Sequence, residues 1–203
     1  MKKIIFVLFL LICILTLNSC EKKIGGCTNE AALNFNSEAN ENDGSCISIG
    51  SSYQGGILAY ILQPADPGYD PNVKHGLIAA PADQRSGMEW GCAGTATGGT
   101  STTLGTGQAN TTAIVNGCLE SSNAAYFCNA LVSGDYSDWY LPSRDELHKL
   151  YQSKDIIGGF ASDRYWSSSE GSEHSAWSHD FGNDSVALNY KYHPYYVCAV
   201  RSF

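Results

Sequence analysis

Cysteine is the residue type whose spacing most constrains the chemistry of this 203-residue chain, which contains eight cysteines and five histidines. Two cysteines, Cys13 and Cys20, belong to the apolar N-terminal region. The six others, an even number, are Cys27, Cys46, Cys92, Cys118, Cys128 and Cys198. No C-x-x-C pair occurs and the histidines are scattered, so the spacing favours disulfide bonds over a zinc cluster. We therefore expect no metal site built on these cysteines.

The N-terminal region has the pattern of an export signal. Lys2 and Lys3 precede an apolar run, Ile4 to Leu17, that is short for a membrane span and typical of a signal-peptide core. The following Leu17-Asn-Ser-Cys20 resembles a bacterial lipobox, in which the chain is cut before a cysteine that is then lipidated. We expect a signal peptide at 1–19, a lipidated tether at 20–26 and attachment to the outer membrane, on its surface or facing the periplasm. The alternative is an uncleaved membrane anchor.

Residues 27–46 form a small unit that is too short to bury a core, and a Cys27–Cys46 disulfide is the expected staple. The unit resembles a short module found in bacterial surface proteins, with Asp43-Gly-Ser-Cys46 intact. Its alternating oxygen-bearing residues are Asn34, Asn36, Glu38, Asn40, Asn42 and Asp43. They leave calcium binding open, but the glycine and glutamate positions of an EF-hand loop are out of register. Polar turn chemistry is the favoured interpretation.

Tyrosines near the C-terminus are the candidate ligand-binding residues. The segment contains Tyr190, Lys191, Tyr192, His193, Tyr195 and Tyr196. An exposed tyrosine ring can stack on the apolar face of a sugar, while lysine and histidine supply polar contacts. The alternative is that these rings cover a strand edge or pack on the core.

Motifs of common enzymes were not found: the sequence has no G-x-S-x-G, H-E-x-x-H or Walker motif. His179 alternates with Trp177 and Phe181, which favours a packed histidine over a catalytic one, since no nucleophile with a supporting base can be named. The net charge of −8 argues against nucleic acid as a partner. We therefore expect no catalytic residue and no cofactor.

The elements that must position these residues follow a linker at 47–52. Strands are predicted at 55–62 and 75–80, joined as a hairpin by a long connection, and helices at 109–116, 123–132 and 143–152. Alternation then predicts strands around 165–170, 177–181, 186–188 and 196–200, so the domain at 53–203 is expected to be α+β. Ser143 and Glu146 have the spacing of a capping box.

The expected structural residues of this domain are Trp139, Pro142, Ser143, Glu146, Trp166, Trp177 and Arg201. The three tryptophans are expected to be core residues because each would bury a large area. Arg201 lies beside an apolar strand, so we expect an ion pair with Glu170 or Asp138.

Several segments of the domain, in order, resemble the Lcl C-terminal domain family, a domain of unknown function named for a bacterial collagen-like adhesin. They are His75-Gly-Leu-Ile-Ala-Ala-Pro, Glu89-Trp-Gly-Cys, Gly105-Thr-Gly-Gln-Ala-Asn-Thr, Ser137-Asp-Trp-Tyr-Leu-Pro-Ser, Tyr165-Trp-Ser-Ser-Ser-Glu and Val200-Arg-Ser-Phe. The resemblance implies a C-type-lectin-like fold and, in some relatives, glycan binding. The tripeptides of calcium-dependent lectins, Glu-Pro-Asn, Gln-Pro-Asp and Trp-Asn-Asp, are absent.

The four cysteines of this domain allow three pairings. We favour Cys118–Cys128, which would join two short helices, and Cys92–Cys198. The alternative is Cys92–Cys118 with Cys128–Cys198. Cys198 lies one position from the usual cysteine of the family, so relatives do not fix its partner.

We therefore predict an exported surface lipoprotein that binds an extracellular partner, a glycan or a surface protein, in adhesion or envelope function. The alternatives are an enzyme on a scaffold like that of the formylglycine-generating domain, or a purely structural surface protein. The sequence does not predict the oligomeric state.

Overall fold

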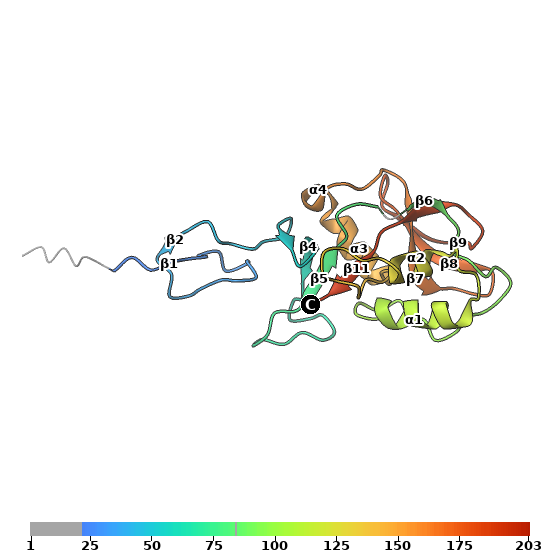
Figure 1. Ribbon diagram of the computed structural model, residues 1–203, viewed down its shortest axis with the longest axis horizontal. Helices are drawn as coiled ribbons and strands as arrows, with labels where there is room; N and C mark the ends of the chain where they lie inside the picture. The colour runs from blue at the N-terminus through green and yellow to red at the C-terminus, as the bar shows by residue number, and fades with distance from the viewer. Residues whose placement is uncertain (1–21, 84) are drawn as a thin grey trace, which may run out of the picture.

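The computed structural model describes residues 22–83 and 85–203, and Figure 1 shows a slender N-terminal extension joined to a larger α+β body. The predicted signal peptide and the predicted lipidation site, Cys20, lie outside the described residues. None of the helices in the described part of the chain is long and apolar enough to cross a bilayer.

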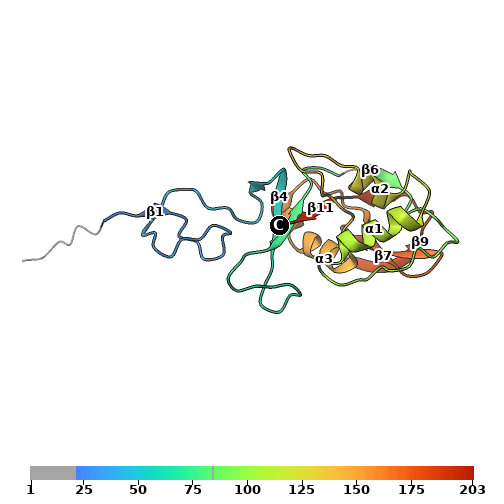
Figure 2. The same ribbon diagram turned by 60° about the horizontal axis from the view of Figure 1, so that its bottom comes forward.

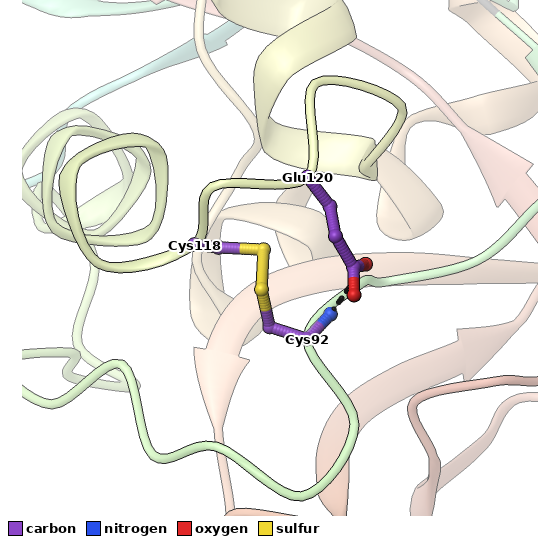
Figure 3. Close-up of side chains that lie close together, drawn as sticks. All are labelled: Cys92, Cys118 and Glu120. Atoms are coloured by element: carbon purple, nitrogen blue, oxygen red, sulfur yellow. Dashed lines mark hydrogen bonds between the residues drawn. A yellow bond between two sulfur atoms is a disulfide. The ribbon is translucent and has the colours of Figure 1, made fainter.

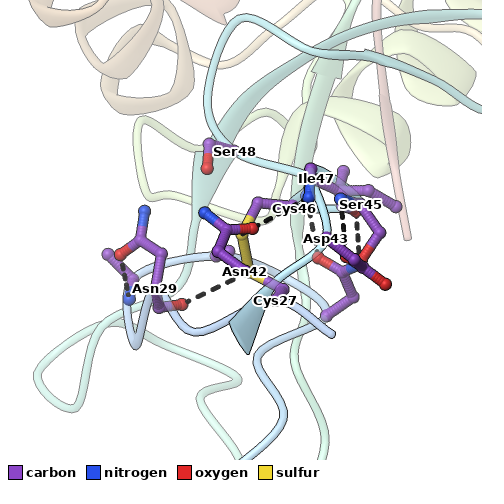
Figure 4. The surroundings of a disulfide bond; sticks show 12 residues. Cys27, Asn29, Asn42, Asp43, Ser45, Cys46, Ile47 and Ser48 are labelled. Atoms are coloured by element: carbon purple, nitrogen blue, oxygen red, sulfur yellow. Dashed lines mark hydrogen bonds between the residues drawn. A yellow bond between two sulfur atoms is a disulfide. The ribbon is translucent and has the colours of Figure 1, made fainter. Parts of the chain in front are cut away.

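The extension contains β1 (Gly25–Gly26) and β2 (Glu41–Asn42), which pair in parallel. The predicted Cys27–Cys46 disulfide is confirmed (Figure 4). Side-chain oxygens of the module accept hydrogen bonds from backbone amides. Asn42 accepts one from Gly44 at 3.0 Å, and Asp43 accepts one from Ser45 at 2.9 Å. Short-range bonds of this kind fix turns in a unit that has little core.

A four-stranded sheet joins the start and the end of the larger body. It contains β3 (Ser52–Tyr53), β4 (Gly56–Ile61), β5 (Gly76–Ala79) and β11 (Val200–Ser202) in the order β11-β5-β4-β3, all antiparallel. The predicted hairpin with a long connection is confirmed as β4–β5. Gly76 allows these strands to approach, because a Cβ there would lie 2.0 Å from the carbonyl oxygen of Tyr60.

A second, five-stranded sheet carries most of the C-terminal half. Its strands are β6 (Arg85–Met88), β7 (Arg164–Glu170), β8 (Ser175–Asp180), β9 (Ser185–Tyr190) and β10 (Tyr195–Val197), in the order β6-β10-β7-β8-β9. Strand β10 runs parallel to β7, and the other pairs are antiparallel. β9 is therefore an edge strand.

The prediction of one continuous strand at 196–200 is wrong. The chain leaves the five-stranded sheet after Val197 and enters the four-stranded sheet at Val200. Residues 197–200 are all buried because they pass between the two sheets, which hides the alternation that would have marked the break.

The described part of the chain has four helices. Figures 1 and 2 show helices packed around the two sheets. They are α1 (Gly107–Gly117), α2 (Ala124–Asn129), α3 (Arg144–Gln152) and α4 (Lys154–Ile157). The first three confirm the helices predicted from sequence. Helix α1 contacts β7, and α3 contacts β4, β7 and β8, so α3 bridges the two sheets.

The predicted capping box at the start of α3 is confirmed. The Ser143 hydroxyl accepts the amide of Glu146 at 3.3 Å, and Glu146 accepts the amide of Ser143 at 2.7 Å. The Glu146 carboxylate also accepts from the Gly105 amide at 3.1 Å and from the Tyr140 hydroxyl at 3.3 Å. Pro142 is buried just before the cap. The cap therefore ties α3 to the loop that leads into α1.

Three tryptophans lie in the core, but not the three that were predicted. Trp139 and Trp166 are buried, and their indoles donate to carbonyls of Tyr136 and Met88. Trp90, which was not among the predicted core residues, is 1% exposed, and its indole donates to the Ser167 carbonyl at 2.8 Å. The prediction for Trp177 is wrong: it is half-buried, and the guanidinium carbon of Arg144 lies 5.1 Å from its ring centroid.

Candidate functional site

The tyrosine-rich segment forms the end of β9, a turn, and the start of β10. The turn is closed by a hydrogen bond from the His193 amide to the Tyr190 carbonyl at 3.0 Å, and Pro194 ends it. The backbone of Lys191 contributes at both sides: its amide donates to His174 and its carbonyl accepts from Trp90. These bonds fix the turn against the domain and leave its outer side chains exposed.

Two of the predicted residues form a stacked pair on this turn. The ring centroids of Tyr190 and Tyr192 are 5.4 Å apart with an interplanar angle of 7°. The two side chains are 55% and 53% exposed. His193 lies beside them, 5.0 Å from Tyr192 and 6.2 Å from Tyr190 between ring centroids. We call Leu188, Tyr190, Tyr192 and His193 the aromatic edge.

An open depression of about 410 Å³ adjoins the aromatic edge. Its lining residues are Ser175, Leu188, Asn189, Tyr190 and His193. Asn189 is held in place, since its amide donates to the Ser178 hydroxyl at 2.8 Å and its oxygen accepts from Tyr195 at 3.1 Å. The depression thus combines apolar rings with oriented polar groups.

Lys191 and Tyr195 do not belong to the exposed surface, so these two predictions are wrong. Lys191 is fully buried, with its ammonium 2.6 Å from Glu170 Oε1. Tyr195 is half-buried and packs on Trp166, with ring centroids 4.7 Å apart. Lys191 lies between the exposed Tyr190 and Tyr192 and is on the opposite side of the chain, inside the domain.

Sequence reasoning also missed the apolar residues that continue the surface along β9. Val186, Leu188 and Tyr190 alternate along this edge strand and are 39%, 47% and 55% exposed. The period of two was visible in the sequence and predicted the strand, but it did not tell which face is exposed. The exposed fractions of Val186, Leu188 and Tyr190 show that this face of β9 is uncovered.

The predicted disulfides of the domain are wrong. The structure bonds Cys92 to Cys118 (Figure 3), while Cys128 and Cys198 are buried thiols. The Cys92 amide donates to the Glu120 carboxylate at 2.8 Å, which positions Cys92 in a left-handed conformation with φ of 47°. Cys92–Cys118 belongs to the alternative pairing, but its second bond, Cys128–Cys198, is not formed. Cys92, Cys118 and Glu120 are close enough for a metal site, but the two sulfurs are already bonded to each other.

The predicted ion pair of Arg201 is confirmed with Asp138. The guanidinium donates to both carboxylate oxygens, at 2.7 and 2.8 Å, and to Gln54 at 2.7 Å. It also lies 4.1 Å from the Tyr136 ring centroid. These contacts join β11 to the segment before α3, so their role is structural.

Residues 80–201 match the Lcl C-terminal domain family. The match covers more than half of the chain, so this α+β protein belongs to that family. No curated protein matches the chain.

Proposed function

We propose that this protein is a surface lipoprotein whose C-type-lectin-like domain binds a glycan at the aromatic edge. The exposed stack of Tyr190 and Tyr192 carries the proposal. Exposed aromatic rings present an apolar face that matches the C–H groups of a sugar ring, and tyrosine hydroxyls remain free for hydrogen bonds. The two rings stack on each other, so each keeps one outer face that a sugar ring can contact.

The adjoining depression supports the proposal because it supplies polar partners beside the rings. Binding sites typically combine apolar walls with a few oriented polar groups. Here Asn189 and Ser175 supply the polar groups, while Leu188 and Tyr190 supply the wall. His193 lines the same depression and can either donate or accept.

The charge at the site favours neutral over sulfated sugars. Lys191 is the only lysine of this segment, and its ammonium is buried against Glu170. A fully buried cation paired at 2.6 Å cannot reach a ligand on the surface. Recognition would then depend on stacking and neutral hydrogen bonds, and would change little with salt.

A glycan array with the full chain in detergent, run with and without chelator, tests the proposal. We expect binding to neutral glycans that chelator does not abolish. Tyr190→Ala and Tyr192→Ala should each weaken it roughly fivefold, since an aromatic contact contributes on the order of 1 kcal/mol. Tyr69→Ala is the matched control, because Tyr69 is 38% exposed and lies in the β4–β5 connection. Absence of binding, or equal effects of all three variants, would contradict the proposal.

A surface protein that pairs with β9 is the second candidate. The observation that favours it is the free edge of β9 with its exposed Val186 and Leu188, since such edges can accept another strand. A Val186→Lys variant separates the two functions. It should abolish strand addition and leave glycan binding at Tyr190 and Tyr192 intact.

A further inference from the structure

Three side chains with metal-binding chemistry meet at one end of the five-stranded sheet. His148 comes from α3, His179 from β8 and Asp184 from the turn between β8 and β9. One ligand atom from each lies within 4.8 Å of the other two. Nothing in the aromatic edge accounts for this cluster.

The two histidines are held by ring contacts. Their ring centroids are 5.4 Å apart with an interplanar angle of 20°. Tyr151 and Phe181 pack against His179, with centroids at 4.5 and 5.4 Å. These contacts keep the two imidazoles side by side before any ion binds, which lowers the entropic cost of assembling a site.

His179 is 1% exposed, yet its hydrogen bonding is incomplete. Its Nε2 lies 2.9 Å from Asp184 Oδ1, while Nδ1 is buried and has no hydrogen-bond partner among residues 22–83 and 85–203. Burial lowers the pKa of His179, and the bond to Asp184 only partly opposes this. Neutral imidazole is the form that binds a metal.

His148 and Asp184 complete an accessible arrangement. The amide nitrogen of Gln152, which can only donate, lies 3.1 Å from His148 Nε2, so this nitrogen presents its lone pair. Asp184 is in the left-handed region with φ of 63°, and its amide donates to the Asp180 carbonyl at 3.0 Å. Its side chain is 54% exposed, so ions and water reach the cluster from this side.

We propose that His148, His179 and Asp184 bind a divalent transition-metal ion, with Zn²⁺ as the representative ion and water as a further ligand. Two imidazoles and one carboxylate suit zinc, whereas calcium prefers a set made only of oxygens. Metal–ligand distances of about 2.0–2.2 Å place tetrahedral ligands roughly 3.3 Å apart, so the three groups must draw together. Asp184 lies in an exposed turn and His148 is only half-buried, so both side chains can adjust.

Binding would join α3 to the β8–β9 turn through the metal. The ion would replace the direct bond between His179 and Asp184 and the bond between His148 and Gln152. It therefore stabilises the folded chain by mass action, because the unfolded chain does not bring the three ligands together.

The test is titration of the chelator-treated full chain in detergent with Zn²⁺, followed by calorimetry and thermal unfolding. We expect one Zn²⁺ per chain and a higher unfolding midpoint. His148→Ala and Asp184→Asn should each weaken binding by at least tenfold. His174→Ala is the matched control, since His174 is an exposed histidine beside Glu173 and should leave the affinity unchanged.

Co²⁺ identifies the ligands independently of affinity. We expect visible bands of a site with nitrogen and oxygen ligands, and their loss in His148→Ala. Intense sulfur-to-metal bands would instead assign the ion to Cys128 and Cys198 and would overturn the proposal. Absence of Zn²⁺ binding to the wild type would also overturn the proposal. The same holds if both ligand variants bind Zn²⁺ with wild-type affinity while circular dichroism shows that they are folded. None of these measurements depends on glycan binding. A negative result for Zn²⁺ therefore does not contradict the proposed glycan site at the aromatic edge.

Discussion

Lys191 Nζ lies 2.6 Å from Glu170 Oε1, and the two side chains are 0% and 8% exposed. The ammonium also donates to the Thr95 carbonyl at 2.9 Å and lies 4.5 Å from the Trp90 ring centroid. The second oxygen of Glu170 accepts the Gly98 amide at 3.1 Å. One buried ion pair thus fixes the long glycine- and threonine-rich loop against the five-stranded sheet.

Removing one member of this ion pair should destabilise the protein more than removing both members. Lys191→Met leaves the Glu170 carboxylate buried without its cation, and we expect a loss of about 3–5 kcal/mol in the free energy of unfolding. The double variant Lys191→Met with Glu170→Gln should recover much of that loss. Urea unfolding measures both. A double variant no more stable than the single one would show that the pair itself is not the main interaction.

Acid should destabilise the protein through Glu170 and Asp138. Burial raises the pKa of Glu170, but Lys191 and the amides of Thr97 and Gly98 outweigh it, so this pKa lies below 4.5. Hydrogen bonds from Arg201 hold the pKa of Asp138 below 3.8. The folded state binds fewer protons at these groups than the unfolded state does. Their stabilisation is therefore complete above the unfolded values and is lost as pH falls through the folded ones.

Unfolding free energies measured from pH 6 to pH 2 check this sign. The wild type should lose stability more steeply below pH ~4.5 than the Lys191→Met, Glu170→Gln double variant, which lacks one of the two carboxylates. Parallel curves for the two proteins would exclude Glu170 as a contributor.

Arg201 should not be replaceable by lysine. Arg201→Ala removes a two-pronged bond to Asp138 and the contact with Tyr136, and we expect a loss of about 1–3 kcal/mol because Asp138 remains half-exposed. Arg201→Lys should recover only part, since an ammonium cannot make both carboxylate bonds in one plane. Arg85→Ala, at an exposed arginine over Phe127, is the control and should change stability by less than about 1 kcal/mol. Equal stability of the lysine variant and the wild type would argue against the fork geometry.

Peptide mapping without reduction should recover Cys27 linked to Cys46 and Cys92 linked to Cys118. Cys128 and Cys198 should react with alkylating agents only after denaturation, because both are buried and burial raises the pKa of each thiol. Cys92→Ser and Cys118→Ser should destabilise the chain equally, by about 2–4 kcal/mol. A peptide in which Cys128 is linked to Cys118 or to Cys198 would contradict this pairing.

The features that the sequence predicted well depend on residues close along the chain. The Ser143–Glu146 cap, the α3 helix and the β4–β5 hairpin each follow from spacing over a few residues. The wrong predictions concern partners that tertiary structure selects. Lys191 is buried with its ammonium against Glu170, and Cys92 reaches Cys118 because the turn at Gly91 packs on Asn123, where a Cβ would lie 2.4 Å from the Asn123 Cβ. No local pattern reports either of these distant partners.

The candidate sites show the same division. Tyr190 and Tyr192 were predicted from residue type alone, because several tyrosines lie close together in this part of the sequence. The meeting of His148, His179 and Asp184 was not predicted, because it requires α3 to lie across β8. His179 was correctly expected to be packed, but the sequence did not place His148 beside it.

The placement of β10 and β11 sets the order in which the domain can form during synthesis. β10 lies between β6 and β7, and β11 pairs with β5, so both sheets await residues 195–202. Folding must therefore draw together segments far apart in sequence, which is slow. Neither sheet has all of its strands before residues 195–202 pair with it.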